Sequence, residues 1–131
     1  MKSPKMEIKL ELVNLIKELC SENREITLLS LSTTDGFNIK SFAAKSLDVE
    51  ADKLAAMSSS LFALSSSSSL QLMKEESTVA TIESKGGNML FKKAQYLSTP
   101  CVVTMVAKPD MSLAQARFAL KRFADTVDSI K

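Results

Sequence analysis

The hydrophobic and polar positions between residues 50 and 74 follow the spacing of an α-helix. Large apolar residues recur at intervals of three and four, and the stretch contains no Gly or Pro. One stripe of the expected helix consists of Leu54, Met57, Leu61, Leu64, Ser68 and Leu72, and a second of Ala55, Ser59, Phe62, Ser66 and Met73. A helix packed on one side only shows a broad polar face, and only a narrow polar line is available here. We therefore predict a long central helix that is covered on two sides, by its own sheet and by a second chain.

Eight serines, at positions 58–60 and 65–69, make this segment a weak helix former. Each serine costs about 0.5 kcal/mol relative to alanine, so that the eight together cost about 4 kcal/mol. Packing against other elements must supply this free energy, and small side chains allow another backbone to approach closely. A flexible Ser-rich linker is the alternative. The apolar residues at helical spacing on both sides of the serines favour the helix.

Two segments before this helix have the composition of strands joined by a hairpin. Residues 26–33 are apolar and β-branched, and a second strand is expected over residues 37–42. Asp35-Gly36 lies in the turn between them. This dipeptide is a strong hairpin signal because glycine adopts positive φ without a steric cost.

Three further strands are expected after the central helix. Residues 77–83 and 89–93 alternate apolar and polar positions on either side of a Gly-Gly turn. A longer connection is expected over residues 94–100. Residues 101–107 are almost wholly apolar, which is typical of a strand that is covered on both faces.

Helices are predicted at both ends of the chain. The first is expected to start at or just before Pro4, with Ser3 as its candidate N-cap. The last is expected to start near Ser112, with Gln115 in the capping-box position. The element order is therefore α-β-β-α-β-β-β-α. We predict one α+β domain over residues 1–131, a three-layer sandwich in which a five-stranded antiparallel sheet has the central helix on one face and the terminal helices on the other.

Composition places the chain among ordinary globular proteins. Of its 131 residues, 45% are hydrophobic and 24% are charged, and the net charge of +2 predicts no strong attraction to nucleic acid or to an anionic membrane. Cys20 and Cys101 lie in apolar patterns, so we expect buried free thiols and a reducing, cytoplasmic compartment. No apolar run approaches the ~20 residues that span a bilayer, and no apolar signal core is expected at the start of the chain.

The residues that most enzymes and metal sites require are missing or isolated. The chain has no histidine and only three glycines, which leaves no phosphate-binding loop, and no serine has an identifiable base partner. Glu75-Glu76 forms either a carboxylate pair or, as we favour, a solvated helix end. Lys92, Lys93 and Tyr96 are either a nucleic-acid contact or, as we favour, a solvated strand edge. We expect no enzyme activity, no cofactor, no metal and no nucleic-acid partner.

Three segments together resemble the roadblock/LC7 family, the fold of dynein light chain roadblock and of bacterial partners of Ras-like GTPases. The hairpin over residues 31–39 is similar to the opening hairpin of that family, and residues 51–57 resemble the start of its long central helix. Residues 108–117 resemble its joint between the last strand and the final helix. The element order matches over residues 6–130.

The resemblance implies a homodimer that acts as a non-enzymatic scaffold or regulator of a small Ras-like GTPase or of a motor complex. In this family the central helices pack across a two-fold axis, and the strand after the helix pairs with its mate, which would also cover an exposed sheet edge. The residues we assign to this interface are Ala55, Ser58, Ser59, Phe62, Ser65, Ser66, Ser69, Met73, Thr78, Ala80 and Ile82. On this assignment, Phe62→Glu would break the dimer.

Other functions stay open at this point. Arg117 and Lys121 share one face of the last helix, where they form either a contact for an acidic partner or a solubilising surface. A small-molecule sensor of the PAS or profilin-like type is the alternative function, and it requires a cavity of several hundred Å³, on the order of that of known ligand sites. An enzyme is the third hypothesis, and the missing acid–base residues argue against it.

Overall fold

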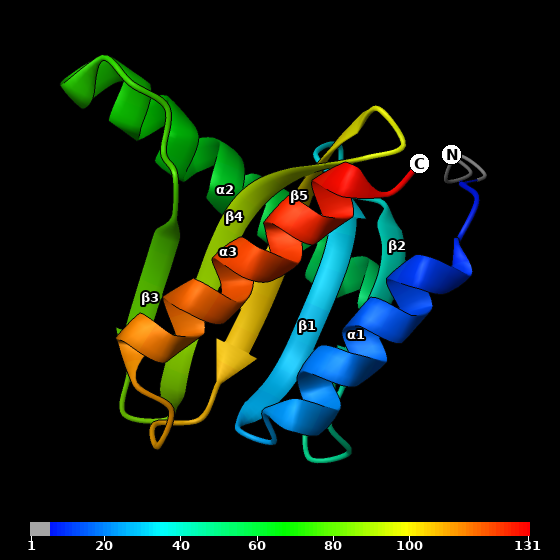
Figure 1. Cartoon of the computed structure of the whole chain (residues 1–131). Coiled ribbons are helices and arrows are strands. Elements are labelled where there is room, and N and C mark those ends of the chain that lie inside the picture. Colours follow the sequence, from blue (N-terminus) through cyan, green and yellow to red (C-terminus); the bar gives the residue numbers. More distant parts are fainter. Residues whose placement is uncertain (1–5) are drawn as a thin grey trace.

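The structure, a computed structural model, describes residues 6–131 and contains three helices and five strands (Figure 1). In chain order these are α1 (Leu10–Glu22), β1 (Ile26–Thr33), β2 (Asn38–Ala43), α2 (Ala51–Met73), β3 (Ala80–Ser84), β4 (Gly87–Tyr96), β5 (Thr99–Ala107) and α3 (Leu113–Ser129). This order and the α+β class confirm the prediction from the sequence.

The five strands form one antiparallel sheet in the order β2-β1-β5-β4-β3. The apolar strands β1 and β5 lie in the middle, and β2 and β3 form the edges. Figure 1 shows α1 and α3 side by side over one face of the sheet, while α2 crosses the other face. The three predicted layers are therefore present.

The two faces of the sheet differ in chemistry because side chains alternate along each strand. Leu29 and Leu31 of β1 belong to the main core, which lies between the sheet and the α1/α3 layer. The neighbouring Ser30 lies on the α2 face, opposite Thr104 of β5 in the strand register. The α2 face therefore has a smaller apolar cluster, formed by Phe62, Phe91 and Val102.

The ends of the helices follow the sequence closely. The segment predicted as residues 50–74 is helical over residues 51–73, and Lys74 ends it in the left-handed conformation, with φ of 65°. At α3 the predicted capping box is present. Gln115 N donates to Ser112 Oγ at 3.1 Å, and Ser112 N donates to Gln115 Oε1 at 3.3 Å.

The connection predicted over residues 94–100 is a tight turn instead. β4 continues to Tyr96 and β5 begins at Thr99, so only Leu97 and Ser98 join them. Both turn residues have positive φ, of 49° and 67°. Two-residue hairpin turns with this backbone match the twist of the strands, but Asn and Gly usually signal them. Leu97-Ser98 carries neither signal, and the long-loop prediction was wrong for that reason.

The start of the first helix also differs from the prediction. α1 begins at Leu10, and Met6–Lys9 precede it without helical structure. The Tyr96 hydroxyl accepts a hydrogen bond from Lys9 N at 2.9 Å and donates one to the Glu7 carbonyl oxygen at 2.7 Å. These bonds tether the segment to the end of β4. The predicted cap at Ser3 and Pro4 lies outside the described residues.

Candidate interaction surface

One apolar stripe of α2 is exposed on the single chain. Met57, Leu61, Leu64 and Leu72, spaced by four, three and eight residues, lie on one face of the helix, and we call them the α2 stripe. Leu64 is 66% exposed and Leu72 is 81% exposed. Figure 1 shows that the C-terminal half of α2 projects past the edge of the sheet, where no other element of the chain lies against it. Contiguous exposed apolar residues of this kind typically mark interaction sites.

The edge strand β3 lies next to this helix in the chain and is unpaired on one side. Within residues 6–131, β3 pairs only with β4, which leaves its other edge open. Ile82 on this strand is 45% exposed. An open edge presents backbone N–H and C=O groups that can pair with another strand. The α2 stripe and the β3 edge together form the candidate interaction surface.

The structure buries four of the eleven residues assigned to the interface from the sequence. Ala55, Ser58 and Phe62 are buried within the single chain, and Ser69 is only 8% exposed. Phe62 lies in the apolar cluster with Phe91 of β4 and Val102 of β5. The chain's own sheet covers Phe62, and Ser69 Oγ donates a hydrogen bond to the Glu75 carbonyl of the segment after α2 at 2.7 Å. These side chains are therefore covered within the single chain. Periodicity revealed two stripes but carried no information about which one the sheet would cover.

The remaining residues of the predicted interface are more accessible. Met73, Thr78 and Ile82 are exposed, and Ser59, Ser65, Ser66 and Ala80 are half-buried. Ser59 Oγ donates to the Ala56 carbonyl and Ser65 Oγ to the Phe62 carbonyl, each at 3.1 Å. Such bonds within the helix satisfy the hydroxyls locally, so that serine is tolerated on a face with little water.

Buried polar atoms lie between α2 and the sheet. The hydroxyls of Ser30, Ser32, Ser58 and Thr104 and the amide oxygen of Asn38 are inaccessible and have no hydrogen-bond partner among residues 6–131. A buried polar group without a partner costs about 1–3 kcal/mol. The attachment of α2 to its own sheet is therefore less favourable than an apolar interface of the same size.

Arg117 and Lys121 do not form an open basic pair. Both side chains are exposed on α3, but Lys121 Nζ lies 2.8 Å from Asp125 Oδ2. This hydrogen bond lowers the pKa of the Asp125 carboxyl. Within the described residues Arg117 takes part in no ion pair. Lys121 is thus already engaged with a carboxylate of its own helix, which reduces its availability for an acidic partner.

The other polar candidates are separated by the fold. Successive residues Lys92 and Lys93 point to opposite faces of β4, and Lys93 Nζ lies 3.9 Å from Glu76 Oε2. Tyr96 is fully buried. Across residues 6–131, no three side chains of the types His, Cys, Asp and Glu are grouped closely enough to hold a metal ion. None of the helices described has the length and apolarity that crossing a membrane requires.

Both cysteines are buried free thiols. Burial raises the pKa of the Cys20 thiol, and that of the Cys101 thiol, from the ordinary value of 9.0 to about 11. Cys101 Sγ donates a hydrogen bond to the Thr99 carbonyl at 3.3 Å. Both side chains belong to the main core. Because the thiolate is the nucleophilic form, these residues act as core side chains rather than as reactive groups.

No protein-family model and no curated protein match this sequence. Solved structures do match it. MglB of Myxococcus xanthus superimposes with a TM-score of 0.79 at 15% identity, covering 94% of this chain and 96% of that one. An MglB with a tetrameric arrangement gives 0.81 at 15% identity, with 98% and 96% covered. A roadblock/LC7 domain from Streptomyces avermitilis gives 0.74 at 20% identity, with 88% and 92% covered.

A profilin also shares the architecture, but less closely. Profilin II of Acanthamoeba castellanii gives a TM-score of 0.58 at 11% identity, covering 88% of this chain and 95% of that one. The roadblock/LC7 structures match better, over nearly the whole length of both chains. The chain therefore has the roadblock/LC7 fold.

Proposed function

We propose that this protein is a non-enzymatic homodimeric scaffold that regulates a small Ras-like GTPase. The α2 stripe is the observation that carries the proposal. It places four large apolar side chains on a helix that projects beyond its own sheet. The roadblock/LC7 fold supports the same conclusion, because the resemblance implies dimers that serve GTPases or larger assemblies.

The dimer is proposed to form by a two-fold contact. In such a contact the same surface patch is used on both chains, so the α2 stripe of one chain lies against the α2 stripe of its partner. The open edge of β3 adds a second element, since two β3 strands can pair and join the sheets. Covering Leu64 and Leu72 removes apolar surface from water, which contributes about 25 cal/mol per Å². This gain offsets the weak helix propensity of the serines and the unpaired hydroxyls under α2.

A GTPase partner is proposed because the resemblance to the roadblock/LC7 family implies one, and the chain has no nucleotide-binding loop of its own. Its glycines are confined to Gly36, Gly86 and Gly87, and none forms part of a phosphate-binding motif. Nucleotide would therefore be held by the partner. The proposed scaffold contacts that partner through its sheet and helix surface, as the resemblance implies.

Titration calorimetry tests this function. The probes are Ras-like GTPases encoded in the same genome, loaded with either GDP or a non-hydrolysable GTP analogue. We expect one of them to bind, with an affinity that depends on the nucleotide. Leu64→Glu, which disrupts the proposed dimer, should weaken binding, whereas Leu10→Glu at an exposed position of α1 on the opposite layer should not. Equal affinity for both nucleotide states, or binding to none of the GTPases, would contradict the proposal.

A further inference from the structure

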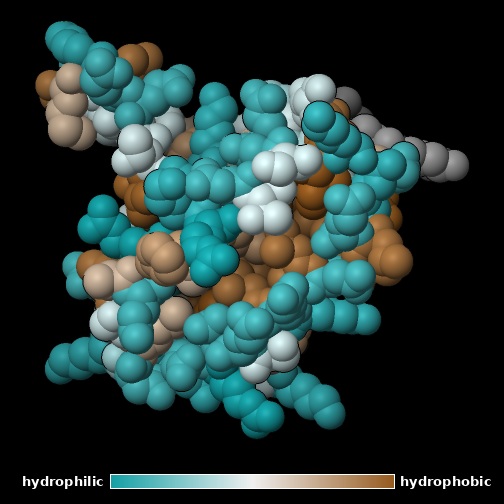
Figure 2. Space-filling model, in the orientation of Figure 1, coloured by the Kyte–Doolittle hydropathy of each residue, from teal (hydrophilic) through white to brown (hydrophobic). Residues whose placement is uncertain are grey.

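An open groove of about 510 Å³ lies between α1 and α3, on the side of the sheet opposite α2. Figure 2, which views this side, shows a brown apolar strip exposed between the teal surfaces of the two helices. Apolar side chains line the groove from both helices and from the turn before α3: Leu15, Leu19, Met111, Ala119 and Phe123. Met111 and Phe123 are buried at the base of the groove, and Leu15, Leu19 and Ala119 form a half-exposed apolar floor.

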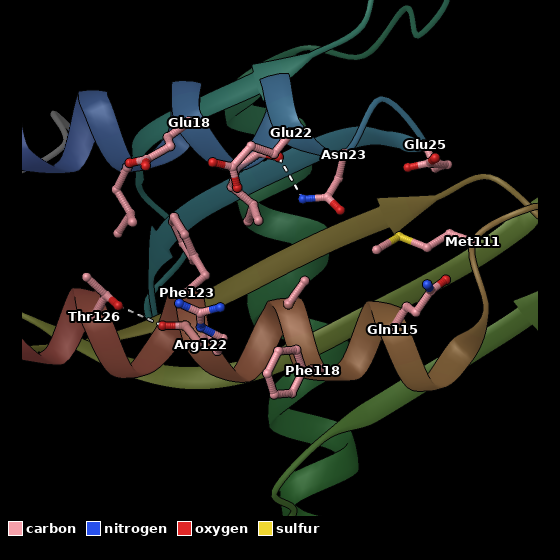
Figure 3. A pocket seen from close by; sticks show the side chains of 13 residues that line it. Glu18, Glu22, Asn23, Glu25, Met111, Gln115, Phe118, Arg122, Phe123 and Thr126 are labelled. Carbon is pink, nitrogen blue, oxygen red and sulfur yellow. Dashed lines mark hydrogen bonds between the residues drawn. The ribbon is translucent and has the colours of Figure 1, made fainter.

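Carboxylates dominate the α1 wall of the groove. Glu18, Glu22 and Glu25 line it from α1 and from the turn that follows, and Figure 3 shows them along one side. Arg122 of α3 is the one basic side chain in the lining. None of these carboxylates has an ion-pair partner within residues 6–131. The groove is therefore negatively charged although the whole chain carries a net charge of +2.

An exposed aromatic side chain stands on the α3 wall. Phe118 is 63% exposed, and the guanidinium of Arg122 lies over its ring, 5.7 Å from the centroid. Figure 3 shows both side chains projecting from α3 beside the groove. Aromatic residues and Arg are enriched among the residues that dominate binding energy at protein interfaces. Phe118 thus provides an anchor point beside the apolar floor.

The groove continues along α1. A second hollow of about 320 Å³ shares Leu15, Glu18 and Thr126 with the first and adds Glu11. α1 has 13 residues, which at 1.5 Å per residue gives a length of about 20 Å. A helical or extended segment of a partner fits this length better than a compact small molecule does.

We propose that the α1/α3 groove binds a basic amphipathic segment of a partner protein. Apolar side chains of that segment occupy the floor beside Phe118, and its Lys or Arg side chains face Glu18 and Glu22. Charge complementarity of this kind favours the correct partner and excludes others. The carboxylates of the α1 wall repel the negative charge of nucleic acid and of anionic membranes, so the groove disfavours both. The inference does not depend on the GTPase function, since α2 and β3 lie elsewhere on the fold.

Selection from a displayed library of random peptides about 18 residues long, with the full chain as bait, tests the specificity. We expect the enriched peptides to carry a net positive charge and apolar residues at spacings of three and four. Their affinity should fall several-fold as the salt is raised from about 0.05 to 0.5 M, because screening weakens exposed charge pairs. Enrichment of acidic or neutral peptides, or of none, would overturn the proposal.

Variants of the full chain then locate the site with an enriched peptide as the probe. Glu18→Lys/Glu22→Lys should weaken binding by about tenfold or more, and Phe118→Ser by a similar factor. Asp48→Lys/Glu75→Lys makes the same charge change outside the groove and should leave the affinity within about twofold, apart from long-range screening effects. The groove variant, Glu18→Lys/Glu22→Lys, should fold, because lysine near the C-terminus of α1 interacts favourably with the helix dipole. Circular dichroism checks its folding.

Nuclear magnetic resonance of the wild-type chain supplies the independent readout. Addition of the enriched peptide should shift amide signals of α1 and α3 and leave those of α2 unchanged. Shifts centred on α2 or β3 would overturn the proposal even if binding were strong. Equal weakening by the groove variant and by the Asp48→Lys/Glu75→Lys control would also overturn it, because net charge alone would then explain the binding.

Discussion

Phe62 of α2 and Phe91 of β4 lie in one apolar cluster on the face of the sheet opposite α1 and α3. Both side chains are buried, at 6% and 1% exposure. They fix the rotation of α2 about its axis, since the side that carries Phe62 must face the sheet. The α2 stripe is consequently turned outward, and this rotation explains both the small cluster and the exposure of Leu61 and Leu64.

Phe62→Glu should therefore disrupt the folded chain itself. It places a carboxylate in an apolar cluster and removes a buried aromatic side chain, and we expect a loss of about 3 kcal/mol or more in the free energy of unfolding. Leu64→Glu is the matched control, because position 64 is exposed and a folded single chain tolerates the charge. Urea unfolding followed by circular dichroism measures the difference. Equal stability of the two variants would show that Phe62 does not hold α2 to the sheet.

The unpaired hydroxyls under α2 predict a stabilising substitution. Thr104→Val keeps the shape of the side chain and removes a buried hydroxyl that has no partner, so the free energy of unfolding should rise by about 1 kcal/mol. Thr126→Val is the control, because Thr126 Oγ1 donates to the Arg122 carbonyl at 2.9 Å and is exposed. Chemical denaturation gives both values. A loss of stability in Thr104→Val would mean that its hydroxyl has a favourable contact.

Tyr96 is expected to hold the N-terminal segment against the end of β4. Tyr96→Phe removes the bonds to Lys9 N and to the Glu7 carbonyl and should cost about 2 kcal/mol. Hydrogen exchange provides the specific test. The Lys9 amide should exchange faster in the variant, while amides in the middle of α3 keep their relative protection. Unchanged exchange at Lys9 would contradict the tether.

The cysteines predict a loss of stability in alkali. Their pKa is about 11 in the folded chain against an ordinary value of 9.0. As the pH rises from 9 to 11, the unfolded chain releases thiol protons that the folded chain retains, so the stability falls. Well below pH 9, at about pH 7, the thiols stay protonated in both states and add no slope.

Comparison with Cys20→Ala/Cys101→Ala isolates this effect from the titration of tyrosine and lysine. The wild-type chain should lose more stability across the alkaline window than the variant, whatever their difference at neutral pH. The same burial predicts slow alkylation of the folded wild type at pH 8. Identical pH slopes for the two proteins would rule out raised thiol pKa values.

The local features of the fold could be predicted because their signals are local. The periodicity over residues 50–74 located α2 to within one residue at each end, and Ser112 with Gln115 marked the start of α3. Asp35-Gly36 marked the first hairpin, where Gly36 has φ of 96°. Each of these features depends on residues close together in the sequence, so that spacing and residue type suffice.

The features that depend on distant residues could not be predicted in this way. The start of α1 depends on the Tyr96 hydroxyl, which comes from 87 residues further along the chain. The orientation of the two α2 stripes depends on Phe91 and Val102, which reach Phe62 only after the sheet has formed. The α1/α3 groove similarly combines carboxylates of the first helix with Phe118 of the last. The individual residues were visible in the sequence, but their proximity was not.

Sedimentation equilibrium at micromolar concentration tests the central claim, that the α2 stripe is a dimer surface. The wild-type chain should show twice the 14.3 kDa mass of a single chain, and Leu64→Glu should show the single mass while remaining folded. Phe118→Glu is the control, because the Phe118 side chain is apolar and about as exposed as that of Leu64 but lies in the α1/α3 layer. This variant should stay dimeric. A monomeric wild type, or a Leu64→Glu variant that is still dimeric, would contradict the account.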